Sequence, residues 1–547
     1  MNILNNLNKD LTSVLNKFNL SENIDLRISN IEEFDFQINN LVKHQQHINI
    51  NEIKKQFEEK LSNCDEIFNY EITKSLFINI ELNLDLILNE FENLDEIIKI
   101  DKKQKIIIDY GGPNIGKPLH VGHLRSLNIG RSLYSINKAA GNQIVSDIHL
   151  GDWGMPIAQI LTFCEENDIQ IDKLTINKLV EIYPKASSQY QNKKDFEEKA
   201  KKINLDLNNS DKETLKKWAM IKKLSIDSIK TTLDKLNHRF DFWLGESDVN
   251  HLIPEMLKNL EDTNKISKDN GAFVSNLDCD PKILITKSDG SYLYLTTDLA
   301  TVLHRLKNNE FDKILYVVDN RQTLHFKQLF DSINYFSFSN KNFEHISFGT
   351  VNDENGNPLK TRDGGTKQLN ELFLETYNYI KKMNDSLDEE NLEILANTVI
   401  TYSDLLTNRK TDYKFDLKKF TNVNGKTGIY IQYALVRAKK LFLDSKVVKK
   451  DLKLNSLFLD TEDIEFLKCL IKFEIYFNQA LTNSEPHHLA DYLYDISNLF
   501  NKIYQSENIL NNENNEKKLN KLLICYYFIE FSNLLMKLLG IRSVSKM

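Results

Sequence analysis

The chain has 547 residues, a length that corresponds to two to four domains. Its 70 basic and 78 acidic residues leave a net charge of −8, and 41% of its residues are hydrophobic. This composition excludes wholesale disorder, and the 18 glycines and 8 prolines are too few for a collagen-like or loop-dominated architecture. Five widely spaced cysteines, none in a CxxC pair, argue against a disulfide framework or a cysteine zinc site.

The chain shows no signal for export or membrane insertion. No uninterrupted apolar stretch approaches the ~18–20 residues that a membrane span needs. The first residues, MNILNN, lack the apolar core of a signal peptide. We therefore expect a soluble, cytoplasmic protein that does not associate with a membrane.

Residues 1–100 combine amphipathic helical patterns with short alternating apolar runs, which predicts a small α+β module. Beyond Gln104 the pattern changes. The continuous apolar run 106–108 is typical of a buried parallel strand. A Gly-Gly-Pro loop, a helix over about 120–140 and a strand over about 143–150 follow it and complete a strand–helix–strand unit.

A charged, mostly helical stretch over about 160–255 interrupts the strand pattern, and we interpret it as an insertion. After it, helices are predicted over 298–308 and 324–333, and residues 288–291 have hairpin-turn chemistry. The predicted strands are short apolar runs bounded by turn residues, at 282–286, 292–296, 313–318 and 345–351. This alternation predicts a doubly wound, Rossmann-like α/β domain over 101–366, split by the insertion.

From Leu369 to Leu539 the apolar spacing is helical almost without interruption. It predicts a helical connector over 367–420 and an all-α bundle over 421–547. Residues 401–450 carry twelve basic and four acidic residues. Basic charge beside several tyrosines favours an RNA partner, although a solvated helical face would also explain the charge.

The segment 111–123 reads GGPNIGKPLHVGH and lies where the first predicted strand passes into a helix. Backbone N–H groups at a helix start form an anion site. His120 and His123 fall near one face of the first turn, and each can donate to a phosphate oxygen. Lys117 adds a fixed positive charge, and Gly122 leaves room for a flat base. These parts suit nucleotidyl transfer, in which positioned donors stabilise charge on the α-phosphate and the leaving pyrophosphate.

Two simpler interpretations of this segment are a pair of metal ligands and two histidines without a shared role. A Walker-type phosphate loop is excluded, because no GKS or GKT follows a GxxxxG spacing. The position of the motif after a strand and a glycine loop favours nucleotide binding.

The longer segment 113–126, PNIGKPLHVGHLRS, resembles the HIGH region of class I aminoacyl-tRNA synthetases, and specifically that of arginyl-tRNA synthetases. Further segments resemble motifs of that family in the same order: LGDWG (150–154), DGSYLYLTTDLA (289–300), QTLHF (322–326), NRKTDY (408–413) and YIQYA (430–434). The resemblance extends from about residue 105 to residue 547.

The resemblance implies a multidomain class I synthetase. Its parts would be an N-terminal tRNA-elbow module (1–100), the catalytic domain (101–366), the helical connector (367–420) and a helical anticodon-binding domain (421–547). The implied reaction activates L-arginine with ATP to arginyl-adenylate and transfers arginine to the 3′-terminal adenosine of tRNA(Arg), releasing pyrophosphate and AMP. We expect Mg²⁺ to accompany ATP. We also expect a monomer with no bound organic cofactor and no metal site of its own.

The catalytic residues implied by the resemblance lie on two loops. The family's usual KMSK loop is absent, and residues 357–366 stand in its place, unless they form only an exposed glycine-rich turn. Lys117 would then supply the charge of the missing lysine. The implied catalytic residues are Lys117, His120, His123, Lys360 and Arg362. The implied ATP-binding residues are Pro113, Asn114, Gly116, Lys117, His120, Gly122 and His123.

Arginine selectivity requires carboxylates and polar acceptors around a planar guanidinium. The residues that the resemblance and the sequence assign to this pocket are Asn114, Asp147, Tyr294, Asp298 and Gln322. Three of them have simpler interpretations: Asp298 as a helix N-cap, Tyr294 as strand packing and Asn114 as a turn residue. The pocket's details stay open, since Gly116, Ile148 and Thr297 depart from residues frequent in the family.

The implied tRNA-binding residues lie in the helical bundle: Tyr430, Gln432, Tyr433, Arg437, Tyr504 and Met547. Tyr504 fits the core of the bundle as well. The neighbouring pair His487–His488 is better explained as surface histidines than as metal ligands.

Three other functions compete with this one. A class I synthetase for another amino acid, such as cysteine, is disfavoured by the lack of a cysteine-rich zinc cluster and by Asp298, which favours a cationic substrate. A small nucleotidyltransferase would need no long helical C-terminus. A non-catalytic tRNA-binding paralogue would be free to lose four functional residues of the loop, all of which are present: Lys117, His120, Gly122 and His123.

Overall fold

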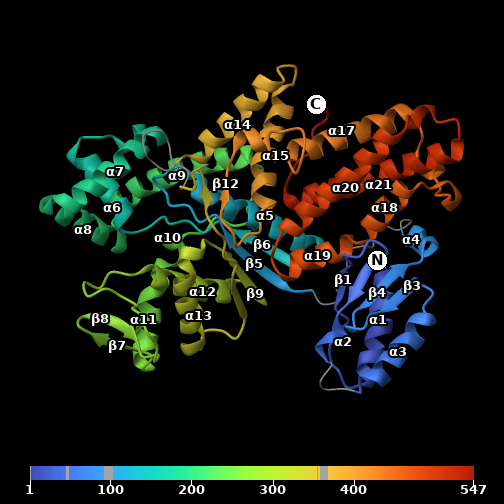
Figure 1. The fold of residues 1–547 in the computed structure, drawn as a ribbon. Helices are drawn as coiled ribbons and strands as arrows, with labels where there is room; N and C mark the ends of the chain where they lie inside the picture. Colours follow the sequence, from blue (N-terminus) through green and yellow to red (C-terminus); the bar gives the residue numbers. More distant parts are fainter. Residues whose placement is uncertain (1, 45–48, 91–102, 354, 358–366) are drawn as a thin grey trace.

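The computed structural model describes residues 2–44, 49–90, 103–353, 355–357 and 367–547 (Figure 1). The chain opens with an α+β module whose antiparallel sheet has the strand order β1-β2-β4-β3. The elements of this module are α1 (Asn2–Lys17), β1 (Leu26–Ile28), β2 (Phe36–Ile38), α2 (Asn40–Lys43), α3 (Ile50–Ser62), β3 (Ile67–Ile72), β4 (Ile78–Leu82) and α4 (Leu84–Glu90).

A parallel four-stranded sheet of order β10-β9-β5-β6 forms the centre of the molecule. Its strands are β5 (Lys105–Tyr110), β6 (Gln143–Asp147), β9 (Lys313–Val317) and β10 (Asn342–His345). The apolar run 106–108 of β5 is buried, as expected for a strand covered on both faces. The chain runs from β5 to β6 on one side and later to β9 on the other, so the carboxyl ends of β5 and β9 form a topological switch point.

Three helices connect or cover these strands: α5 (Leu124–Ala139), α12 (Tyr294–Asn308) and α13 (Thr323–Tyr335). A 3-10 turn, η2 (Val121–His123), leads into α5. The doubly wound arrangement predicted from the sequence is confirmed for this part of the chain.

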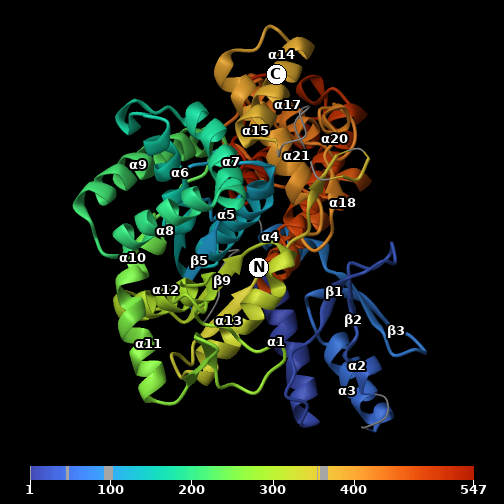
Figure 2. The ribbon, with the colours of Figure 1, turned by 90° about the vertical axis from the view of Figure 1, so that its left-hand side faces the viewer.

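The insertion forms a helical unit with its own apolar cluster. Its helices are α6 (Met155–Glu166), α7 (Ile176–Asn192), α8 (Lys194–Asn208) and α9 (Lys212–Lys235). The elements α10 (Glu246–Val249), α11 (Ile253–Asp262), β7 (Ile266–Asp269) and β8 (Ala272–Ser275) follow. Figures 1 and 2 place the insertion helices and the N-terminal module on opposite sides of the central sheet.

Three predicted strands differ in the structure. Residues 282–286 and 292–296 form only isolated bridges, and α12 already begins at Tyr294 because the N–H groups of residues 296 and 297 both donate to the Leu293 carbonyl. The turn at 288–291 does form. The third strand, predicted over 345–351, is divided: β10 ends at His345, while β11 (Val351–Asn352) pairs with β12 (Tyr413–Lys414).

The remainder of the chain is helical, as predicted. Two long helices, α14 (Leu369–Met383) and α15 (Glu389–Leu405), and the short α16 (Leu417–Phe420) precede the bundle. The bundle comprises α17 (Gly428–Ser445), α18 (Thr461–Ile471), α19 (Phe473–Thr482), α20 (His487–Ser506) and α21 (Asn515–Leu539). Among the described helices, only α21 is long and apolar enough to span a membrane, but 67% of its apolar window is buried inside the protein.

Candidate functional site

The loop after β5 is joined to the neighbouring helix and strand. Gly111 follows β5 with a φ of +91°, a conformation that glycine adopts without strain. Its N–H donates to Ser126 Oγ of α5 at 2.8 Å, and Ser126 Oγ donates to the Val317 carbonyl of β9 at 2.6 Å. These bonds hold the loop at the switch point of the sheet.

Asn114 is positioned by the loop that follows β6. The Ile115 N–H donates to the Gly151 carbonyl at 3.0 Å, and the Gly151 N–H donates to the Pro113 carbonyl at 3.1 Å. A Cβ at residue 151 would lie 1.9 Å from Asn114 Oδ1, so this close approach requires glycine. The backbone of Asn114 is therefore fixed by pairing, and its side chain stays exposed at the edge of the sheet.

His120 and His123 are oriented by the 3-10 turn η2. The Gly122 N–H donates to Nδ1 of His120 at 3.1 Å, and the N–H of His120 donates to Nδ1 of His123 at 3.1 Å. Because a backbone N–H can only donate, Nδ1 of His120 is an acceptor and its neutral ring carries the hydrogen on Nε2. His123 Nδ1 also lies 3.2 Å from the His120 carbonyl oxygen. We assign the Nε2–H tautomer to His123 as well, since a hydrogen on its Nδ1 would face the His120 N–H. The ring centroids are 4.1 Å apart. Two Nε2–H donors thus lie beside one another, an arrangement that suits an anion and argues against a metal pair.

Burial keeps both rings neutral. It lowers the pKa of His123 to about 3, and the charges of His120 and Lys117 add to this effect. Burial and the charge of Lys117 also lower the pKa of His120. At physiological pH the two rings therefore donate without a full charge, and Lys117 supplies the fixed charge of the loop.

The chain returns to this loop just before α14. The Val121 N–H donates to the Lys367 carbonyl at 3.0 Å, and the Leu369 N–H donates to the Leu119 carbonyl at 2.9 Å. The predicted catalytic residues Lys360 and Arg362 lie outside the described residues, a few positions before this pairing.

The acidic residue predicted for the arginine pocket lies inside α12. This helix has Leu293 as its N-cap residue, so the simpler interpretation of Asp298 as an N-cap is wrong. His325 Nε2 of α13 lies 2.6 Å from Asp298 Oδ2. Gln322 immediately precedes α13 and is exposed. Tyr294 is 70% exposed and opens α12, so the strand-packing interpretation of this residue is also wrong.

Asp147 has a different environment from the one expected. It is the register partner of Asp109 at the carboxyl ends of β6 and β5. Arg305 Nη2 of α12 donates to Asp109 Oδ2 at 2.5 Å and to Asp147 Oδ2 at 2.7 Å. Burial alone would raise the pKa of Asp147, but the contact with His149 and the charge of Arg305 hold it below its ordinary range. The expected contact with substrate is corrected accordingly, because a side chain that is 1% exposed and bound by an internal guanidinium offers no free carboxylate.

A further carboxyl group beside the arginine pocket predicted around Asp298 (the arginine recess) was not recognised from the sequence; it lies on α10, which packs against α12. Glu246 is the first residue of α10, and its N–H donates to the Leu150 carbonyl at 3.1 Å. Burial raises the pKa of Glu246 to about 7; the charge of His149 opposes this rise, whereas those of Asp152 and Asp298 add to it. The recess therefore contains a second acidic group that can change its charge near neutral pH.

Comparison with known proteins identifies the family. The family model described as "tRNA synthetases class I (R), catalytic domain" matches residues 84–417, and the "DALR anticodon binding domain" matches residues 431–547. An arginine–tRNA ligase from Francisella tularensis subsp. novicida is 34% identical over 586 aligned residues, which cover 100% of both chains. The chain belongs to the arginyl-tRNA synthetase family. A second arginine–tRNA ligase, from Agathobacter rectalis, is 33% identical over 89% of each chain.

Solved arginyl-tRNA synthetases have the same fold. The enzyme from Plasmodium falciparum superposes with a TM-score of 0.83 at 24% identity and covers 99% of each chain. The enzyme from Thermus thermophilus gives a TM-score of 0.83 at 18% identity over 99% of this chain and 100% of the other. The family resemblance that the motifs showed over about residues 105–547 is confirmed by the relative from Francisella tularensis, whose alignment also covers residues 1–100.

Three of the residues that the arginyl-tRNA synthetase resemblance assigns to tRNA form one cluster on the bundle. The guanidinium carbon of Arg437 lies 4.9 Å from the ring centre of Tyr433 and 4.2 Å from that of Tyr504. Tyr433 is 42% exposed. Tyr430, on the same helix α17, donates from its hydroxyl to Asn498 Oδ1 at 3.4 Å.

Gln432 has a structural role in this synthetase that the sequence did not indicate. It is fully buried, and its Nε2 donates to Thr398 Oγ1 at 2.9 Å and to the Arg542 carbonyl at 2.7 Å. Its Oε1 accepts from the Val544 N–H at 3.0 Å. The predicted direct contact with tRNA is corrected, because Gln432 instead holds the C-terminal segment that ends at Met547, whose side chain packs against the core.

Two groups of described residues have the composition of a metal site. One consists of Asp109, Asp147 and His149, and the guanidinium of Arg305 already binds both carboxylates.

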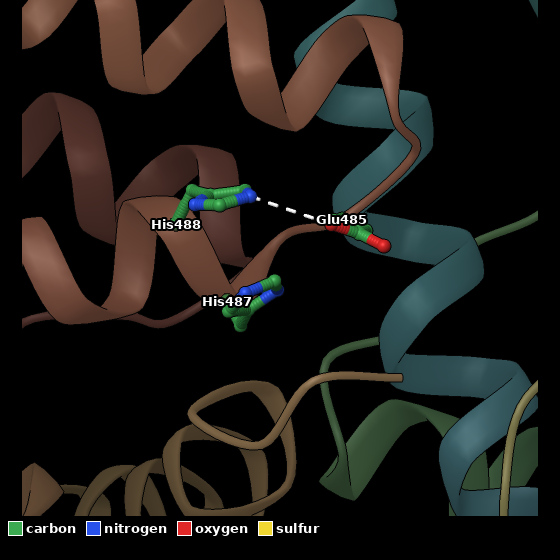
Figure 3. A group of neighbouring side chains, drawn as sticks. All are labelled: Glu485, His487 and His488. Atoms are coloured by element: carbon green, nitrogen blue, oxygen red, sulfur yellow. Dashed lines mark ion pairs between the residues drawn. The ribbon is translucent and has the colours of Figure 1, made fainter. Parts of the chain in front are cut away.

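The other group lies at the start of α20 and consists of Glu485, His487 and His488 (Figure 3). Lys410 Nζ is 3.2 Å from Glu485 Oε1, so a cation here would meet an existing positive charge. His488 Nε2 lies 3.4 Å from Glu485 Oε2. The two imidazole planes differ by only 33° with centroids 4.1 Å apart, so their in-plane lone pairs do not converge on one point. These contacts favour an ion-pair cluster over a metal centre.

Proposed function

We propose that the protein activates L-arginine with ATP and transfers the arginyl group to the 3′-terminal adenosine of tRNA(Arg). Membership of the arginyl-tRNA synthetase family supports this reaction. The structural observation that carries it is the pair of neutral Nε2–H donors on His120 and His123, beside the charge of Lys117, at the switch point of the sheet. Asp298 lies on a neighbouring helix of the same edge.

In the first step, a carboxylate oxygen of arginine attacks the α-phosphorus of ATP, and the bond from that phosphorus to the pyrophosphate oxygen breaks. No proton has to move, and no covalent protein intermediate forms. We assign the two imidazole Nε2–H groups to the phosphate oxygens on which charge accumulates, and Lys117 to the leaving pyrophosphate. Pro113, Asn114, Gly116 and Gly122 shape the surface against which ATP lies. Mg²⁺ enters with ATP as part of the substrate.

The guanidinium of the substrate is assigned to Asp298. Its Oδ2 is held by His325, which fixes the direction of the carboxylate. Tyr294 lies one turn before Asp298 on α12, and Gln322 immediately precedes α13. Asn114 is assigned to the α-amino end of arginine. A planar, permanently charged guanidinium matches a fixed carboxylate better than a lysine ammonium does.

In the second step, a hydroxyl of the terminal ribose attacks the carbonyl carbon of arginyl-adenylate. The bond from that carbon to the phosphate oxygen breaks, and AMP leaves with the hydroxyl proton on its phosphate. We assign Tyr433, Arg437 and Tyr504 to tRNA, together with Tyr430 and Met547, because a guanidinium between two rings offers both charge and stacking surfaces. Residues 1–100 are assigned to the tRNA elbow, 101–366 to catalysis, 367–420 to the connector and 421–547 to the anticodon. Lys360 and Arg362 remain catalytic candidates. We propose a monomer that acts in the cytoplasm.

Amino-acid-dependent exchange of pyrophosphate into ATP, measured for all twenty amino acids with and without tRNA, tests this function. We expect exchange with arginine and with none of the other nineteen amino acids. Exchange driven by a different amino acid would overturn the specificity, and the absence of exchange with any of them would favour a non-catalytic tRNA-binding protein.

A further inference from the structure

The ammonium group of Lys117 rests on an aromatic ring that comes from the insertion. Lys117 Nζ lies 3.8 Å from the ring centre of Tyr183, on α7. This distance is well inside the ~6 Å range of a cation–π contact. Within the described part of the chain, Lys117 makes no ion pair. The charge that the proposed mechanism needs is therefore held by a ring and not by an anionic side chain of the described residues.

The loop can approach α6 closely, with α7 beside it, because residue 116 is a glycine. A Cβ there would lie 2.7 Å from Ile160 Cδ1 and 3.8 Å from Tyr183 Cδ2, and its φ of +82° also favours glycine. The Gly116 N–H donates to Ser225 Oγ of α9 at 2.9 Å. Three helices of the insertion thus contact the residue directly before Lys117, which fixes the position of the ring relative to the lysine.

The arginine recess has two carboxyl groups, Glu246 on α10 and Asp298 on α12, and these two helices pack against each other. An ammonium released from the ring of Tyr183 would have carboxyl groups of this recess among its alternative partners. Such a pairing would neutralise acceptors that the substrate guanidinium requires and would remove Lys117 from the phosphates.

We propose that Tyr183 is a positioning residue that holds the Lys117 ammonium in place and free of an anionic partner until ATP binds. The proposal rests on the assignment of Lys117 to pyrophosphate. A ring attracts an ammonium more weakly than a phosphate does, so the lysine passes from the ring to ATP as the phosphates arrive. A carboxylate in the place of Tyr183 would compete with the phosphates instead.

The test is arginine-dependent pyrophosphate exchange by the full chain with tRNA present. For Tyr183→Leu, we expect the KM for ATP to rise about five- to tenfold, the scale of one partly desolvated cation–π contact, while the KM for arginine changes less than about twofold. Tyr183→Phe keeps the ring and should restore the KM for ATP. The matched control is Tyr190→Leu, two turns further along α7, which should leave the KM for ATP unchanged.

A double-mutant cycle separates positioning from structural support. In a Lys117→Met background, Tyr183→Leu should change exchange by less than about twofold, because the group it positions is absent. An equal loss with and without Lys117 would overturn the proposal.

Fluorinated phenylalanines at position 183 provide a second measurement that does not depend on the folding of Tyr183→Leu. They keep the shape of the ring and weaken its attraction for a cation. The KM for ATP should rise with each added fluorine, and a flat series would refute the role of Tyr183. If Lys117→Met alone left exchange unchanged, the assignment of Lys117 would fail and this proposal with it.

Discussion

At the scale of single residues, the proposed catalysis depends on which nitrogen of each imidazole carries the hydrogen. The backbone of η2 determines this by donating to both Nδ1 atoms, so His120 and His123 present Nε2–H groups without being protonated. Their capacity to donate hydrogen bonds from Nε2 therefore comes from local backbone geometry and burial, and not from a positive charge.

Replacement of His123 by alanine should lower the rate of arginine-dependent exchange by about 10²–10³, the scale of losing one transition-state donor. His251→Ala, at an exposed position after α10, is the control and should exchange at the normal rate. A normal rate for His123→Ala would remove this residue from the mechanism.

Acid should destabilise the fold through a second buried histidine, His238, which is 2% exposed and has no hydrogen-bond partner for either ring nitrogen among the described residues. Burial and the charge of Arg131 hold its pKa well below the ordinary value of 6.5 in the folded protein. Below pH 6.5 His238 takes up a proton in the unfolded chain but stays neutral in the folded protein. The free energy of unfolding therefore falls by up to about 1.4 kcal/mol per pH unit.

The melting temperature measured between pH 7.5 and 5.0 checks this expectation. His238→Phe should show a shallower decline on acidification than the unmodified protein, with a similar melting temperature at pH 7.5. Identical pH profiles for the two proteins would contradict the assigned linkage.

Single-residue roles were predictable only where a motif carried them. The loop from Pro113 to His123 was recognised because its spacing reflects its chemistry. The environment of Asp147 could not be read in this way, since its partner Arg305 lies 158 residues away and is brought to it only by the packing of α12. Glu246 was missed for the same reason, because it reaches the recess through a bridge between distant segments.

At the scale of elements, the C-terminal segment is held against the bundle by hydrogen bonds from buried side chains. The buried amide of Gln432 binds the backbone at Arg542 and Val544, and Asn391 Oδ1 accepts from the Ser545 N–H at 3.0 Å. All three bonds join side chains to main-chain groups of the C-terminal segment. They therefore fix the path of its backbone and not the positions of its side chains.

Gln432→Ala should release this segment. It leaves two buried backbone groups without partners, which costs about 2–6 kcal/mol at about 1–3 kcal/mol per group. We expect a lower melting temperature, faster removal of the last residues by carboxypeptidase, and a higher KM for tRNA with an unchanged KM for ATP. Gln505→Ala, at an exposed position on α20, is the control. Protection of the C-terminus in Gln432→Ala would show that other contacts suffice.

Element types followed from periodicity except where short apolar runs were ambiguous. The long helices and the strands β5, β6 and β9 were predicted because each has a sustained pattern. The run at 292–296 was predicted as a strand, and the structure begins α12 within it, at Tyr294, since four consecutive apolar residues fit either element. Tertiary contacts settle such cases, here the hydrogen bond from Thr296 Oγ1 to the Ile285 carbonyl.

At the scale of the whole molecule, α5 joins the active-site loop to the helical half of the chain. Arg125, two residues after His123, is 1% exposed and donates to Asp404 Oδ1 of α15 at 3.0 Å. It also donates to the carbonyls of Gly349 and Thr411 at 3.1 and 2.6 Å. One buried guanidinium therefore connects the catalytic sheet, the β11–β12 pair and α15.

Arg125→Met should lower stability by about 3–5 kcal/mol, because it leaves the carboxylate of Asp404 buried and unpaired. The combination Arg125→Met with Asp404→Leu should recover part of this loss. The exposed pair Arg239–Asp234 offers the matched control, and Arg239→Met should change the melting temperature by less than about 1 °C. Thermal unfolding of the four proteins measures the difference, and equal effects at the two arginines would contradict this role.

The most direct measurement is a structure of the protein with a non-hydrolysable analogue of arginyl-adenylate. The account predicts that the group replacing the phosphate lies against Nε2 of His120 and His123, with the guanidinium on the carboxylate of Asp298. An analogue bound at another edge of the sheet, or a guanidinium surrounded by apolar side chains, would contradict it.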